Sequence, residues 1–210
     1  MTTPLVTSIA IEELTSGNLK TGKPAVATLL DRGALPQAGA ALASVPTQQL
    51  NDPGISFLRG RLAWQQLQTG NKDYGPEDVR RFWERAVKKQ PKSIAYLNAL
   101  GFAYYAEGKF NRANQTWYNA LSLIKEDKTI PQEALNTYAG LALGLKQLAQ
   151  KQSSGKQRSI LLNQAISLRQ KVIIEDPLNF QPDALSNNWM WSEQAIQDWR
   201  SLVATTARAN

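Results

Sequence analysis

The sequence of 210 residues contains neither cysteine nor histidine. Without cysteine the chain can form no disulfide, no thiolate metal site and no thiol nucleophile. Without histidine it lacks the side chain best suited to proton transfer near neutral pH, and also the usual zinc ligand. Only carboxylates, lysine, tyrosine or an oxygen-ligated metal remain for chemistry. We therefore expect no enzymatic activity, no catalytic residue, no cofactor and no metal site.

Long apolar runs are also missing. No run approaches the roughly 18 residues that a membrane-spanning helix needs, and the first residues lack the basic and then apolar pattern of a secretory signal. With 42% hydrophobic and 20% charged residues, the composition is that of an ordinary soluble domain. These features predict a cytoplasmic protein without a membrane partner, organised as one elongated helical domain.

Residues 94–124 carry the most regular pattern in the chain. Two apolar stripes at helical spacing follow each other and predict two amphipathic helices. Gly101 and Ala120 are small enough to let these helices approach closely, and Gly108 can turn the chain between them. The stripes consist of Leu97, Leu100 and Tyr104, and then of Phe110, Ala113, Trp117 and Ala120.

This alternation of large and small residues resembles the tetratricopeptide repeat, in which two antiparallel helices form one unit. Trp83-x-x-Ala86 repeats the pattern of Trp117-x-x-Ala120 and indicates a second unit. The resemblance implies an all-α fold of antiparallel helix hairpins stacked in a right-handed superhelical solenoid. It also implies a function, which is to present a concave groove to a peptide or helix of a partner protein, as a monomer or weak homo-oligomer.

The chain divides into three parts on this reading. Residues 1–23 form an N-terminal segment whose structure the sequence pattern determines only weakly, and residues 24–177 form the repeat array. Residues 178–210, which we call the tail, form a C-terminal capping segment and helix. The array has four units, at about residues 24–50, 55–91, 94–124 and 132–177.

Residues 17–23 look like the glycine-rich loop that binds nucleotide phosphates, G-x-x-x-x-G-K. The next residue is Pro24, which lacks both the metal-binding hydroxyl and a backbone donor. We therefore interpret this stretch as a polar turn, with Pro24 at the first position of a helix.

The tail contains three of the six tryptophans of the chain, Trp189, Trp191 and Trp199. Trp191, Ala195 and Trp199 recur at helical spacing, and Ser192 can cap that helix. Repeat arrays end in atypical helices that cover the last apolar face. We interpret these tryptophans as part of such a cap, with a docking surface for a partner as the alternative.

The family's groove is lined by the first helix of each unit. In this sequence, the positions that commonly face the ligand carry aromatic, amide and cationic side chains. Only Arg61 and Asn98 resemble the residues with which some family members bind a terminal carboxylate. The residues at these places are Phe57, Arg61, Trp64 and Gln65 in the repeat over residues 55–91, Asn98, Phe102 and Tyr105 in the repeat over 94–124, and Thr137 and Leu141 in the repeat over 132–177.

Two alternatives accompany this prediction. Repeat modules of this kind also occur as regulatory or docking regions of larger bacterial signalling enzymes such as serine/threonine kinases. A basic helix over residues 80–92, in a chain of net charge +7, instead suggests nucleic-acid binding through Arg81, Arg85, Lys88 and Lys92. Phe82, Trp83 and Ala86 interleave with these cations at core spacing, so a solvated helix face explains them better.

Overall fold

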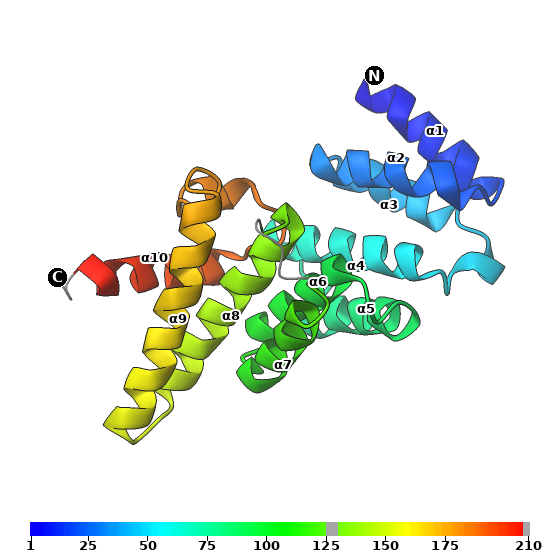
Figure 1. Ribbon diagram of the computed structural model, residues 1–210. Coiled ribbons are helices and arrows are strands. Elements are labelled where there is room, and N and C mark those ends of the chain that lie inside the picture. Colours follow the sequence, from blue (N-terminus) through cyan, green and yellow to red (C-terminus); the bar gives the residue numbers. More distant parts are fainter. Residues whose placement is uncertain (125–129, 208–210) are drawn as a thin grey trace. The chain divides into compact units, whose positions relative to one another are not determined.

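The computed structural model describes residues 1–124 and 130–207, in which every regular element is a helix (Figure 1). The predicted all-α class is therefore confirmed. In this described part, no helix has the length and apolar content needed to cross a membrane. The elements are α1 (Thr3–Thr15), α2 (Leu19–Asp31), α3 (Leu35–Ala43), η1 (Thr47–Gln49), α4 (Pro53–Gln68), α5 (Pro76–Lys89), α6 (Ile94–Ala106), α7 (Phe110–Leu121), α8 (Gln132–Gln150), α9 (Gly155–Glu175), η2 (Ala184–Asn187) and α10 (Glu193–Ala207).

The helices form two compact units, Met1–Pro91 and Lys92–Asn210. In the first unit α1 packs on α2, α3 packs on both, and α4 contacts α2 and α3 and pairs with α5. In the second unit α6 pairs with α7, α7 packs on α8, and α8 pairs with α9. Within residues 53–175, α4 and α5, α6 and α7, and α8 and α9 each form a pair of contacting helices.

The beginning of the chain differs from the prediction. The turn between α1 and α2 spans Ser16–Asn18, with Gly17 at φ +81°, and α2 begins at Leu19, so that Pro24 lies inside the helix. The early start is favourable because it brings Gly22 against Leu14 of α1, where a Cβ would lie 2.5 Å from Leu14 Cδ2. This close packing outweighs the backbone hydrogen bond that Pro24 cannot make. Residues 19–23 are thus helical and form no phosphate-binding loop.

A tryptophan packed directly on glycine recurs in both units. Within the first, a Cβ on Gly60 would lie 2.4 Å from Trp83 Nε1. Within the second, the indole of Trp117 is enclosed by two glycines. A Cβ on Gly101 of α6 would lie 2.3 Å from Trp117 Nε1, and one on Gly140 of α8 would lie 2.3 Å from its Cε2. The predicted close approach of small and large residues is confirmed, and only glycine fits at these places.

The tail folds back onto the second unit. Its helix α10 packs on α8 and η2, and Trp191 and Trp199 are buried, as expected of core residues. Ser192 caps α10 by accepting a hydrogen bond from the Ala195 amide, at 3.2 Å. On α9 the side chain of Ile174 stays 78% exposed. The tail thus packs on α8 and leaves part of the outer side of α9 in water.

Candidate functional site

The four groove residues predicted in the first unit contact other parts of that unit. Arg61 forms an ion pair with Asp31 of α2 at 2.5 Å, and Gln65 Nε2 donates to the Leu30 carbonyl at 3.1 Å. Burial is the largest influence on the guanidinium of Arg61 and lowers its pKa, although Asp31 acts in the opposite direction. Phe57 and Trp64 pack on Trp83, with ring centroids 6.4 and 5.7 Å away.

The predicted residues of the second unit are buried and partly bonded to one another. The Thr137 hydroxyl donates to Asn98 Oδ1 at 2.7 Å, and Asn98 Nδ2 donates to the Glu133 carbonyl at 3.0 Å. These bonds join α6 to α8. Leu141 is fully buried in α8. Asn98, Thr137 and Leu141 are therefore engaged within the unit itself.

Phe102 carries the tail's main aromatic contact. Its ring lies 5.3 Å from that of Trp191 and 5.2 Å from that of Trp117, centroid to centroid. The Trp191 indole also donates from Nε1 to Asn136 Oδ1 of α8, at 3.0 Å. A buried tryptophan with its N–H satisfied fixes both position and orientation. Trp191 thus anchors the start of α10 on α6 and α8.

Asp198 holds the middle of α10 through a polar cluster. The Tyr105 hydroxyl donates to Asp198 Oδ2 at 2.8 Å, and Lys146 Nζ donates to Oδ1 at 2.9 Å and to the Asp198 carbonyl at 3.2 Å. Gln147 Nε2 donates to the Tyr105 hydroxyl at 3.0 Å, and Gln194 Nε2 donates to Asp198 Oδ2 at 3.0 Å. Lys146 and Asp198 expose only 9% and 12% of their side chains. The pair is nearly dry and fully hydrogen-bonded.

We call the surface formed by Phe102 and Tyr105 of α6 and by Asn136, Lys146 and Gln147 of α8 the tail seat. Two of its residues, Phe102 and Tyr105, are predicted groove residues. The other three escaped the sequence analysis. The sequence did contain one signal. Lys146 interrupts the mainly apolar stretch from Leu141 to Ala149, and a cation buried there requires an acidic partner.

The cluster sets the ionisation of Asp198. Burial disfavours the carboxylate, but the hydrogen bonds from Gln194, Lys146 and Tyr105 and the charge of Lys146 outweigh it and lower the pKa of Asp198. Burial, followed by the neighbouring charge of Asp198, raises the pKa of Tyr105 well above its usual range. The seat therefore holds a carboxylate and a neutral phenol at neutral pH.

A lowered carboxyl pKa predicts acid sensitivity. The unfolded chain binds the proton first, near pH 3.9 for aspartate, so the contribution of Asp198 is complete above that pH and disappears as the pH falls through the folded-state pKa. We expect chemical denaturation to show stability falling below about pH 4, with a shallower fall for Asp198→Asn. The pKa of Asp176 is also lowered, mainly by a hydrogen bond from Asn179, so Asp198→Asn should retain part of the dependence of stability on pH. An unchanged slope in Asp198→Asn would contradict this prediction, and Asp183→Asn, on an exposed carboxylate, is the matched control.

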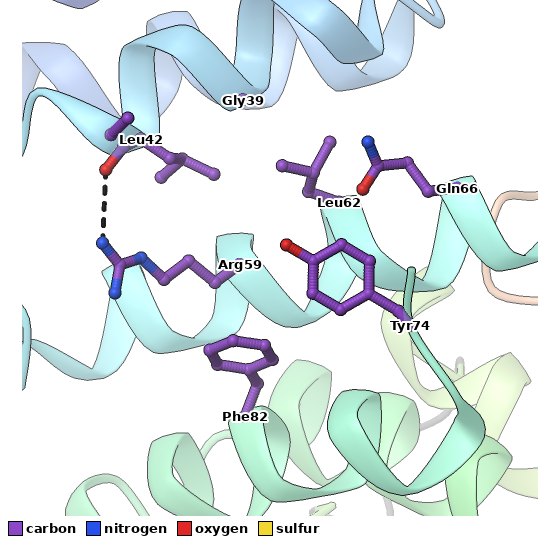
Figure 2. Close-up of a pocket in the computed structure, with 8 residues that line it drawn as sticks. Gly39, Leu42, Arg59, Leu62, Gln66, Tyr74 and Phe82 are labelled. Atoms are coloured by element: carbon purple, nitrogen blue, oxygen red, sulfur yellow. Dashed lines mark hydrogen bonds between the residues drawn. The ribbon is translucent and has the colours of Figure 1, made fainter. Parts of the chain in front are cut away.

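A second candidate site lies in the first unit, as a pocket of about 310 Å³ (Figure 2). It opens between α3 and α4, beside the end of the loop that precedes α5. The sequence did not reveal it, because its residues are not among the predicted groove residues. They are Gly39, Leu42, Ala43, Arg59, Leu62, Gln66, Tyr74 and Phe82.

The basic helix is only partly available to a phosphate backbone. α5 contains five cations and three carboxylates. Arg81 bonds to Glu77 at 2.8 Å and Arg80 to Glu84 at 2.9 Å. Lys92, predicted on the same face, follows the end of α5 at Lys89. These ion pairs weaken a nucleic-acid interface on α5.

No family model matches the sequence, and no curated protein matches it.

Proposed function

We propose that the chain is a cytoplasmic protein-interaction module of the tetratricopeptide type, with its hairpins stacked as a right-handed solenoid. It binds a helical segment of a partner protein and performs no chemistry. The partner segment occupies the tail seat and competes there with α10. Repeats stacked in this manner expose an extended surface for recognition.

The observation that carries this proposal is the way in which the seat holds α10. Trp191 lies on Phe102, and Asp198, seven residues later, reaches Tyr105 and Lys146. Trp191 directly precedes the capping residue Ser192, and Asp198 lies within α10, so the seat holds both the entry to the helix and the helix itself. A surface that recognises an aromatic anchor and an acid at this spacing has what a groove for amphipathic helices needs. The tail thus occupies the seat in the way that we propose for the partner helix.

The test uses the full chain and a labelled peptide with the sequence of residues 188–207. We expect the peptide to bind more tightly when Trp191→Ala and Asp198→Ala weaken the tail, because the seat is then less occupied. We expect Phe102→Ala with Tyr105→Ala to weaken binding by at least about 2 kcal/mol, since buried aromatic anchors dominate such interfaces. Fluorescence anisotropy at two salt concentrations measures both.

Tyr118→Ala is the control, because this tyrosine of α7 is 44% exposed and lies outside the seat. It should leave the affinity unchanged. The same titrations with RNA and DNA should show weak retention only. The proposal fails if tail and seat variants change peptide affinity in the same direction. It also fails if nucleic acid binds tightly with a steep salt dependence carried by Arg81, Arg85 and Lys88.

A further inference from the structure

The pocket of the first unit is built on one row of α4. Arg59, Leu62 and Gln66 follow each other on this row, and Leu42 of α3 faces them (Figure 2). Gly39 forms part of the opposite wall and leaves room there, because a Cβ at this place would already be in van der Waals contact with Leu62 Cδ2, at 3.6 Å. The predicted groove residues Arg61 and Gln65 lie on another row of α4 and bond to α2. The pocket is therefore independent of the expected groove and of the tail seat.

One end of the pocket is cationic. Arg59 donates from Nη2 to the Leu42 carbonyl at 3.3 Å, and no carboxylate among the described residues pairs with it. A second cation stands nearby, since the guanidinium carbon of Arg85 lies 5.0 Å from the centroid of the Phe82 ring. Burial, and then repulsion from Arg85, lower the pKa of Arg59. A partly buried guanidinium with these neighbours attracts an anion.

The middle of the pocket is mainly apolar, and its far end holds a hydrogen-bond acceptor without a donor. Leu42, Leu62 and the ring of Phe82 form the middle, and the Tyr74 hydroxyl points between Arg59 and Leu62 (Figure 2). At the other end, Gln66 Oε1 is buried and accepts no hydrogen bond from any described residue. A buried acceptor without a donor is costly, and a ligand N–H can satisfy it once the Gln66 amide rotates toward the pocket.

We propose that this pocket binds a small amphipathic carboxylic acid. Its carboxylate lies on Arg59, its apolar body contacts Leu42, Leu62 and Phe82, and an amide N–H donates to Gln66 Oε1. The volume is at the lower end of the range for small-molecule pockets, which suits a single acylated amino acid. A planar guanidinium matches a carboxylate through two parallel hydrogen bonds. One arginine that has lost part of its hydration is better compensated by a monoanion than by a phosphate dianion.

Three probes on the unmodified full chain separate the contributions. N-acetylleucine carries the acid, the amide and the apolar body, N-acetylleucinamide lacks the charge, and acetate lacks the body. We expect N-acetylleucine to bind with a dissociation constant on the order of 1 mM, and both others at least about tenfold more weakly. Amide chemical shifts of residues 39–43 and 59–66 in NMR titrations locate the site. Equal binding of the acid and its amide, or no binding of either up to about 50 mM, overturns the proposal.

A pair of variants tests the role of Arg59. Arg59→Met keeps the apolar stem and removes the charge, and should weaken N-acetylleucine at least about tenfold. Arg81→Met is the matched control, because Arg81 lies on α5 outside the pocket and is 61% exposed on its side chain. It makes the same change of net charge and should leave binding unchanged. Equal effects of the two variants would overturn the assignment to Arg59. The comparison of acid with amide stands even if Arg59→Met unfolds.

Discussion

Gly101→Leu is expected to lower the free energy of unfolding of the second unit by more than about 3 kcal/mol. The first carbon of any side chain at this place would lie 2.3 Å from Trp117 Nε1, closer than non-bonded atoms approach. The indole cannot move away, because Gly140 of α8 touches its other side. The leucine must therefore separate α6 from α7. Urea denaturation followed by tryptophan fluorescence measures the loss.

Gly155→Leu is the control for this substitution. Gly155 begins α9, and a Cβ there would meet no atom within 4 Å. Leucine is a better helix former than glycine, so this variant should be as stable as the parent or slightly more stable. If Gly101→Leu were tolerated equally well, the packing of α6 on Trp117 would be wrong.

Asp198→Ala is expected to cost about 3–5 kcal/mol, because it leaves the ammonium group of Lys146 buried without its carboxylate. The second change Lys146→Met removes that stranded charge and fills its place with an apolar side chain. The double variant should therefore recover most of the lost stability. Thermal and urea denaturation of the four combinations give the coupling between the two residues.

Asp183→Ala on the same tail is the matched control. Asp183 pairs with Arg200 at 3.0 Å, but both side chains are largely exposed, and exposed pairs contribute little. Its removal should leave the melting temperature unchanged. If Asp183→Ala and Asp198→Ala were equally harmful, the Lys146 pair would not be the contact that holds α10.

The hairpins could be predicted because their sequence signals are local. Gly101 and Trp117 belong to helices joined by the turn at Gly108, whose φ of +70° is the left-handed conformation that glycine adopts readily. The same holds for Gly60 and Trp83. Helical periodicity combined with small residues identifies such contacts without knowledge of the rest of the chain.

The place of the tail could not be predicted in the same way. Periodicity shows that α10 has an apolar face, and Trp191 and Trp199 are indeed buried. It does not show which helix that face meets. That choice depends on Lys146, because its buried charge is compensated only when Asp198 of α10 lies next to it. Pro24 shows a similar limit, since contact of Gly22 with Leu14 decides where α2 begins.

The contact between Tyr105 and Asp198 spans 93 positions of the chain. A ribosome adds about 5–20 residues per second, so Phe102 and Tyr105, the α6 part of the seat, precede Asp198 by roughly 5 to 20 seconds. During that interval the nascent chain carries Phe102 and Tyr105 without α10 over them. Slower translation of residues 106–198 lengthens the interval. A protein that binds this surface therefore meets least competition on the ribosome, before synthesis has delivered the helix that later occupies it.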